Sequence, residues 1–131
     1  MQCMKLKVDF NKTPLTSGNI ARLFDLPAGA LFDHMKVKRI TAEGGTATVD
    51  IGPYLASNDS AVDADGMLDG LDINTTGYAA SRPGVLAEAA PNTYNPAYSN
   101  GYLPTADVWI GLLANNDLDN AELDIELFYI L

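Results

Sequence analysis

The sequence predicts an all-β fold, an antiparallel β-sandwich with jelly-roll-like strand order and long acidic loops, in a single domain over residues 1–131. The composition favours strands and turns over helices, because Asp outnumbers Glu thirteen to four and Lys and Arg together number only eight. About seven or eight short segments read as strands between turn signals. Strand counting alone leaves an immunoglobulin-like strand order open.

Four strands are predicted in the first half of the chain. In the first, apolar side chains recur at every second residue from Met4 to Phe10, the pattern of a half-buried strand. A Pro-Ala-Gly signal at residues 27–29 and a Glu-Gly-Gly signal at 43–45 separate the next three strands, so we expect a compact β-meander with a hairpin turn at the glycine pair. The predicted strands cover residues 4–10, 20–26, 30–41 and 46–51.

The second half of the chain is less regular. Residues 54–84 are rich in Asp, Gly, Asn and Ser and read as a loop with one short helical turn near 67–71. A weak strand is predicted at 85–89, a crossing over the outside of the sheet at 90–99, and a short strand opening at Tyr102. Two firm strands complete the fold: 107–114, which is apolar on both faces as expected at the centre of a sandwich, and 123–129, which alternates again.

The net charge of −9 is divided unevenly along the chain. Residues 1–39 hold seven basic residues against three Asp, which gives +4, whereas residues 40–131 hold only Arg82 against fourteen acids, which gives −13. A long acidic surface argues against nucleic acid as a partner, because phosphate binding needs clustered Lys and Arg. We expect the basic third either to contact an acidic partner surface or to form ordinary solvated strand faces.

Cys3 is the only cysteine, so the chain cannot form an internal disulfide, and a free thiol is expected there. The N-terminal sequence MQCMKLKVDF lacks the apolar core of a secretory signal. The longest apolar runs are too short to span a membrane, so we expect a soluble protein with no membrane partner.

The acidic loop DADGMLDGLD at residues 63–72 is the sharpest local motif. Calcium prefers several oxygen ligands around a tight turn, and Asp63, Asp65 and Asp69 take the third, fifth and ninth positions of an EF-hand loop if Gly66 is the sixth. The first position then falls on Ala61, where a carboxylate is required. The match is wrong at this anchor, so the favoured interpretation is a solvated loop, with these three aspartates as the metal candidates to test.

No catalytic signature is present. His34 is the sole histidine, which excludes a His-rich metal site, and no serine lies in a GxSxG context that would support a Ser–His–Asp arrangement. The chain also lacks a phosphate-binding glycine loop, and its many acids stand at turns, where acids are common. We therefore expect a non-enzymatic protein with no catalytic residues and no cofactor, and a strand histidine that is partly exposed.

Aromatic residues offer a second kind of binding site. Tyrosines in the region 90–102 are candidates for a carbohydrate platform or a protein interface, because amphipathic rings are favoured at both, and the alternative is that they cover the sandwich edge. Trp109 lies in the most apolar strand and is expected in the core.

The sequence resembles small head decoration, or cement, proteins of tailed bacteriophages. The resemblance covers roughly residues 20–75, with a weaker match at the final strand. Its features are the strand 20–26 followed by Pro-Ala-Gly, then MKVKRITAEGGTATVDIG at residues 35–52, then the acidic run at 63–72. It implies a β-sandwich on the exterior of the virion capsid, made in the host cytoplasm, that binds the major capsid protein as a homotrimer or homodimer and stabilises contacts between its subunits.

The resemblance supplies no functional residue. From the charge division we expect the basic third to face the capsid and the acidic loops to face solvent. The alternatives are a receptor- or glycan-binding module of a phage tail or fibre, which would use the loop tyrosines, and a calcium-dependent adhesin domain. The capsid-interface candidates are Lys5, Lys7, Arg22, Lys36, Lys38 and Arg39.

Overall fold

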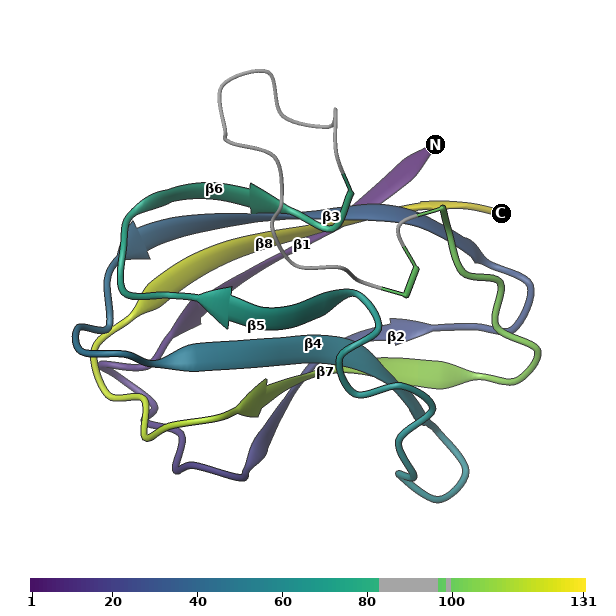
Figure 1. Ribbon diagram of the computed structural model, residues 1–131. Coiled ribbons are helices and arrows are strands. Elements are labelled where there is room, and N and C mark those ends of the chain that lie inside the picture. The colour runs from purple at the N-terminus through teal and green to yellow at the C-terminus, as the bar shows by residue number, and fades with distance from the viewer. Residues whose placement is uncertain (83–96, 99) are drawn as a thin grey trace.

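The computed structural model describes residues 1–82, 97–98 and 100–131 and forms a sandwich of two four-stranded β-sheets (Figure 1). Within these residues no helix is long and apolar enough to cross a membrane. One hydrophobic core lies between the sheets. The strands are β1 (Gln2–Asp9), β2 (Ile20–Leu26), β3 (Leu31–Thr41), β4 (Thr48–Leu55), β5 (Leu68–Asp72), β6 (Gly77–Ala80), β7 (Val108–Ala114) and β8 (Glu122–Ile130).

The strand order identifies the topology as a jelly roll. One sheet has the order β1-β8-β3-β6 and the other β2-β7-β4-β5, and every neighbouring pair is antiparallel. In four of these pairs, β1 with β8, β2 with β7, β3 with β6 and β4 with β5, the strand numbers sum to nine. This is the order obtained when one long hairpin is rolled up, so that its two arms remain paired throughout. The predicted antiparallel β-sandwich is confirmed, and the jelly-roll order is the one observed.

The predicted meander over residues 20–51 is wrong. β2 and β4 belong to one sheet, with β7 between them, whereas β3 lies in the other sheet between β8 and β6 (Figure 1). The glycine pair has the positive φ angles expected of turn residues, 92° at Gly44 and 73° at Gly45, but the link crosses between sheets and is not a hairpin. Turn residues mark where a chain reverses and do not specify the strand with which the next segment pairs.

The predicted loop with a helical turn at 67–71 is also wrong, because this region contains β5 and β6. Leu68 and Leu71 are both buried against β4, although they are three residues apart. Their partners Ile51 and Val49 are only two residues apart, so β5 carries an extra residue between them. This bulge includes Gly70, whose φ of 64° fits a left-handed bulge position.

The remaining strand predictions have mixed outcomes. The predicted strands at 107–114 and 123–129 correspond to β7 and β8, and β7 occupies an interior position of its sheet. Tyr102 forms an isolated bridge with Phe32 in place of a strand. The weak strand at 85–89 lies outside the described residues, as does most of the crossing at 90–99.

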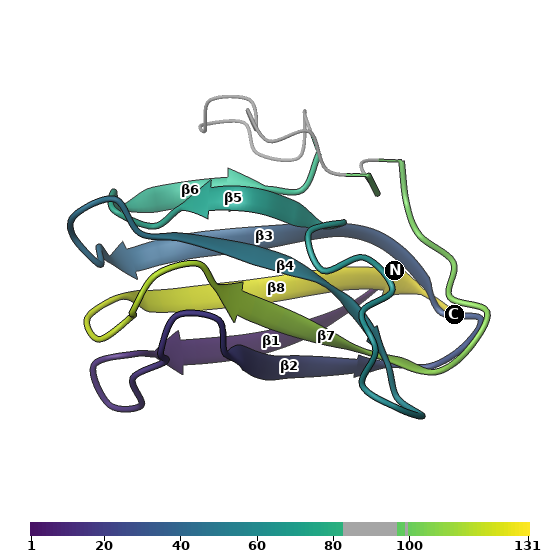
Figure 2. The same ribbon diagram turned by 60° about the horizontal axis from the view of Figure 1, so that its bottom comes forward.

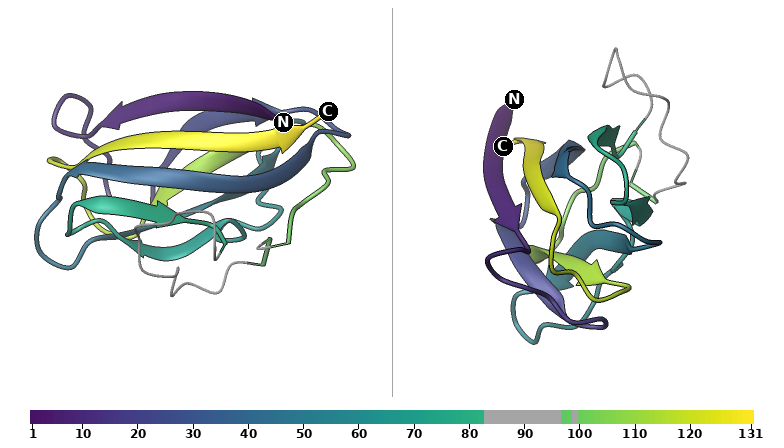
Figure 3. Two further views of the ribbon diagram at one scale, coloured as in Figure 1. Left: turned by 90° about the horizontal axis from the view of Figure 1, so that it is seen from above. Right: turned by 90° about the vertical axis from the view of Figure 1, so that its left-hand side faces the viewer.

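Alternation along each strand divides its residues between the core and the outer surface. In β8, Leu123, Ile125 and Leu127 are completely buried, and the acidic residues between them face outward. The ends of the chain meet in this sheet, because Gln2 of β1 pairs with Tyr129 of β8, and the two termini lie at the same end of the molecule (Figure 3).

Glu43 joins two turns at the other end of the sandwich. Its carboxylate accepts hydrogen bonds from the backbone N–H groups of Asp119, Asn120 and Ala121, with distances of 2.9 Å to Asn120 and 2.6 Å to Ala121. The β3–β4 link is thereby fixed to the β7–β8 turn. Partial burial opposes ionisation of Glu43, but the three N–H donors outweigh it and lower the pKa of the carboxyl group.

Replacement of Glu43 by Gln should lower the free energy of unfolding at pH 7 by about 1–3 kcal/mol, because the backbone donors lose a charged acceptor. Since the pKa of Glu43 is lowered in the folded state, its contribution is present above the ordinary value of 4.5 and is lost as the pH falls through the lower folded-state value. Urea denaturation at pH 7 and at pH 3 measures both effects.

Glu126→Gln is the matched control, because Glu126 makes only loose surface contacts, at 3.9 Å with the Lys5 Nζ atom and at 3.8 Å with the Cys3 Sγ atom. Its cost should stay below about 1 kcal/mol. An equal loss in both variants would contradict a special role for Glu43.

Candidate functional site

Four of the six predicted interface residues lie together on the outer face of the β1-β8-β3-β6 sheet. Cross-strand pairing places Glu126 between Lys5 and Lys36, and Asp124 between Lys7 and Lys38. We call these side chains the lysine face: Lys5, Lys7, Lys36 and Lys38, with Asp124 and Glu126 between them.

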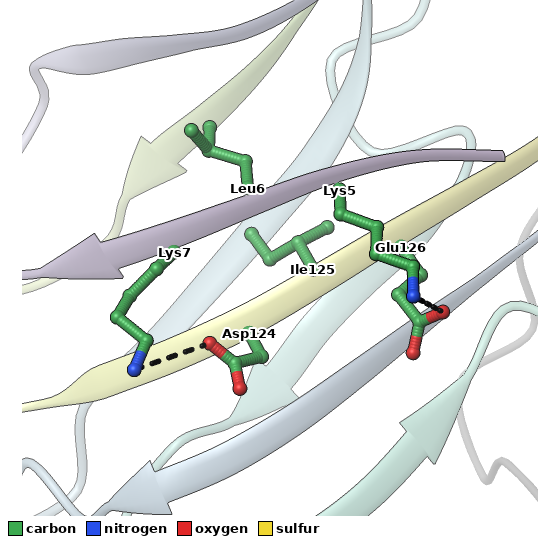
Figure 4. Close-up of a pocket in the computed structure, with 6 residues that line it drawn as sticks. All are labelled: Lys5, Leu6, Lys7, Asp124, Ile125 and Glu126. Carbon is green, nitrogen blue, oxygen red and sulfur yellow. Dashed lines mark ion pairs between the residues drawn. The ribbon is translucent and has the colours of Figure 1, made fainter.

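Ion pairs join β1 to β8 across the lysine face. The Lys7 Nζ atom lies 3.9 Å from Asp124, and Lys5 lies 3.9 Å from Glu126 (Figure 4). Lys7 Nζ also lies 3.2 Å from Glu122. A hydrogen bond to Glu122 and the nearby Asp124 charge raise the pKa of Lys7. The lysine side chains are 74% and 59% exposed at Lys5 and Lys7, so the pairs are screened by salt and add little stability.

The lysines of β3 contact aromatic rings. The Lys36 Nζ atom lies 5.2 Å from the centre of the Phe128 ring, and Lys38 lies 5.6 Å from that of Tyr78. The His34 ring stacks on the Phe128 ring, with ring centres 4.3 Å apart. This face therefore combines charged and aromatic groups along one sheet.

The other two predicted interface residues lie elsewhere. Arg22 is on β2 in the opposite sheet, where it pairs with Asp25 at 2.7 Å and lies 5.2 Å from the centre of the Trp109 ring. Arg39 closes one edge of the sandwich, because its guanidinium group donates to the carbonyls of Asp72 at the end of β5 and of Gly77 and Tyr78 in β6.

In the folded molecule, acidic residues of β8 balance the positive charge of the N-terminal third. β1 and β3 carry the four lysines, but β8 inserts between them and brings acids from the C-terminal, acidic part of the chain. The outer residues of these three strands contain four lysines against Asp9, Glu122, Asp124 and Glu126. The lysine face is thus a mixed-charge surface, in place of the basic surface that the linear charge division suggested.

The acidic loop covers the outer face of the other sheet. A Cβ atom on Gly52 would lie 1.9 Å from the backbone oxygen of Asp63, so only glycine permits this close approach. Val62 N donates to Pro53 O at 2.9 Å, and Met67 N donates to Ile51 O at 2.9 Å. The loop is therefore fixed to β4, and its backbone at Asp63 lies directly against Gly52.

The acidic loop concentrates negative charge without gathering metal ligands. Burial, a hydrogen bond with Asp65 and the Asp65 charge raise the pKa of Asp63, and burial with the charges of Asp65 and Asp50 raises that of Asp69. Within residues 1–82, 97–98 and 100–131, no group of three His, Cys, Asp or Glu residues is arranged to hold a metal ion. The candidates Asp63, Asp65 and Asp69 are close enough to repel one another.

The described tyrosines of the predicted platform are packed against the protein. Tyr98 and Tyr102 stack on each other with ring centres 4.3 Å apart and lie against the core. Burial and the Asp63 charge raise the pKa of Tyr98 to about 12. Tyr54 and Trp109 also stack, at 4.4 Å, and both are buried on the outer face of their sheet, so Trp109 is buried as expected but outside the core cluster. Tyr94 lies outside the described residues.

The single histidine is more buried than expected, with 8% of its surface exposed. His34 Nδ1 lies 2.6 Å from Asp33, and the same carboxylate lies 3.1 Å from Arg82. The hydroxyl of the buried Ser81 accepts a hydrogen bond from the backbone N–H of Met35 at 2.8 Å. These contacts fix the start of β3 to the end of β6.

A groove between β1 and β2 was missed from the sequence. It runs along the edge of the sandwich and is lined by apolar side chains from both strands, with basic residues at its rim. The alternating apolar residues of β1 were correctly assigned to an inner face, but they are only half-buried, because β1 lies at the end of its sheet. Edge position depends on pairing, which periodicity does not encode.

Comparisons with known proteins identify the fold. No protein-family model matches the sequence, and no curated protein matches it. Three chains from phage capsid structures match the fold at TM-scores of 0.59, 0.61 and 0.60. They come from the acid-stable capsid of Helicobacter pylori bacteriophage KHP30, the capsid of cyanophage Pam1 and the capsid of Ralstonia phage GP4.

The matches extend over nearly the whole chain. They cover 99%, 99% and 98% of it, and 86%, 84% and 82% of the respective capsid chains. Sequence identities are only 16%, 14% and 14%, so the likeness demonstrates a shared fold.

Replacement of Asp63 by Asn should raise the melting temperature at pH 7 by roughly 2–4 °C, because it removes repulsion within the acidic loop. Because the pKa of Asp63 is raised, the folded protein binds a proton at this carboxyl group more tightly than the unfolded chain does. Its contribution to stability is therefore present at low pH and is lost as the pH rises through that value, which lies above the ordinary 3.8. The advantage of the variant should shrink as the pH is lowered, as melting curves from pH 7 to pH 4 will show.

Asp25→Asn is the control for this measurement, because Asp25 is exposed and pairs with Arg22. A rise in the melting temperature of the wild type on addition of calcium, absent in Asp63→Asn, would contradict the repulsion account and support a calcium site.

Proposed function

We propose that this protein is a structural component of a bacteriophage capsid, and that it acts as a decoration protein on the outer surface of the head. The observation that carries the proposal is the fold match over nearly the whole chain to chains of three phage capsids. The resemblance of residues 20–75 to head decoration proteins supports the finer assignment.

The surfaces of the molecule are consistent with this role. Within the described residues, the conspicuous features are a mixed-charge face and an apolar groove at the adjoining edge, both of which suit contact with another protein. In this proposal the major capsid protein is the partner, and copies of the chain associate as a homotrimer or homodimer. Repetition around a symmetric shell makes modest contacts effective, because many of them act together.

The proposal predicts direct binding to capsids. Purified protein should sediment with heads of the phage that encodes it, prepared without this protein, and should raise the temperature at which those heads disrupt. Binding should saturate at a fixed number of copies per head, since the sites follow the shell symmetry. Absence of sedimentation, with the protein folded and the heads intact, would overturn the proposal. Binding to a glycan array, without binding to heads, would favour the receptor-binding alternative.

The lysine face should contribute to this binding. A variant with Lys5, Lys7, Lys36 and Lys38 replaced by Gln should bind heads about tenfold more weakly, because each exposed charge contributes a fraction of a kcal/mol to contact with an acidic surface. Its affinity should also depend less on salt concentration. Sedimentation across a range of salt concentrations measures both quantities.

The matched control lowers the net charge by the same amount at other exposed positions. In it, Asp replaces Thr46, Ser57, Thr76 and Asn100. Equal weakening in the two variants would show that total charge, and not the lysine face, governs binding.

A further inference from the structure

The edge formed by β1 and β2 is open. Each of these strands has a paired neighbour on one side only, β8 for β1 and β7 for β2, and the two run along the same margin of the sandwich (Figure 2). Between them lies a groove of about 380 Å³. Its apolar lining consists of Leu6, Val8, Phe10, Leu15, Ala21 and Leu23.

The opposite edge of the sandwich is closed. There β5 leads into β6 through the short link 73–76, and Arg39 joins the two strands through three backbone carbonyls. Leu68 and Leu71 of β5 are fully buried, whereas Leu6, Val8 and Leu23 at the open edge are half-buried. The apolar side chains at the open edge therefore remain accessible to another molecule, whereas those of β5 do not.

β1 is the strand at this edge that can accept another strand. It pairs with β8 over all eight residues without a register shift, so its free side presents a regular row of backbone N–H and C=O groups. β2 is interrupted by a bulge at Leu23, between the paired residues Arg22 and Phe24. Bulges at edge strands disfavour further pairing.

The side chains of β1 define the sequence of a strand that would fit beside it. Residues opposite Lys5 and Lys7 on the outer face should be acidic, and those beside Leu6 and Val8 on the groove side should be apolar. β8 already shows this solution on the other side of β1, since its ELDIELF sequence sets Glu126 opposite Lys5 and Asp124 opposite Lys7. The rim of the groove holds Lys7 and Lys12 against one acid, Asp9, whereas Arg22 is paired with Asp25 and lies over the Trp109 ring.

A second copy of the chain fits this edge poorly through β1 itself. In an antiparallel β1–β1 pairing centred on Leu6, Lys5 of each copy would lie opposite Lys7 of the other. A register centred on Lys5 or on Lys7 would place that lysine opposite its own counterpart. Like charges directly opposite are destabilising, so the edge favours a partner strand of opposite charge.

We propose that the β1 edge binds an extended segment of the capsid protein in which apolar and acidic residues alternate. The segment adds a strand beside β1 and inserts its apolar side chains into the groove between β1 and β2. This inference rests on the proposed function for the identity of the partner, whereas the chemistry of the segment rests on the edge alone.

The first experiment tests the edge without capsids. A fluorescein-labelled peptide of sequence ELDIELF, a copy of the β8 pattern, should bind the intact protein in an anisotropy titration, and a KLKIKLF peptide should bind at least about tenfold more weakly. Ala21→Phe, which fills the groove, should weaken ELDIELF binding by a similar factor. Ala56→Phe, at an exposed position outside the groove, is the control and should bind as the wild type does. Equal binding of both peptides, or no binding of either, would overturn the proposal.

The second experiment identifies the occupant on heads. A photo-crosslinking residue at Lys12, on the rim of the groove, should crosslink to the major capsid protein, and mass spectrometry should locate the link in an acidic, apolar-alternating segment. Crosslinks confined to another copy of the chain would overturn the proposal in favour of self-association. Sedimentation with heads but no crosslink at this position would overturn the groove assignment and leave the capsid role intact. Failure of the protein to sediment with heads would overturn the proposed function. The peptide titration would still decide whether the β1 edge binds an acidic, apolar-alternating strand.

Discussion

The position of β8 between β1 and β3 is the constraint on which the rest of the structure depends. It pairs the last strand of the chain with the first, and it places three fully buried residues, Leu123, Ile125 and Leu127, in the core. The other strands follow the same rolled-hairpin order, in which β2 pairs with β7 in the opposite sheet. The jelly roll closes only when segments more than a hundred residues apart in sequence have paired.

The same pairing determines the surface. Because β8 alternates acidic and apolar residues, it neutralises the lysines of β1 and β3 on its outer face and completes the core with its inner face. β1 is an edge strand, and a strand paired along its free side would meet the same alternating Lys and apolar side chains that β8 meets. The lysine face and the groove are therefore two consequences of one arrangement, and they meet at β1.

The sequence was informative about strands and less so about their partners. Alternation located β1, β3 and β8 well, because a strand with one buried face imposes a period of two residues, and a continuous apolar run located β7. It failed at β5, where the bulge at Gly70 gives Leu68 and Leu71 a helical spacing. It also failed to distinguish a meander from strands that cross between sheets, since the turns at 27–29 and 43–45 serve either arrangement. The charge division along the chain wrongly suggested a basic surface for the same reason. Linear charge does not show that the acidic strand β8 lies between the basic strands β1 and β3.

Cryo-electron microscopy of heads carrying the protein tests the central claim most directly, because it shows which surface of the sandwich meets the shell. The account predicts density for the jelly roll on the outside of the head, with the β1 edge and the lysine face toward the capsid subunits and an added strand beside β1. A molecule attached through the closed β5–β6 edge, with β1 facing solvent, would contradict it.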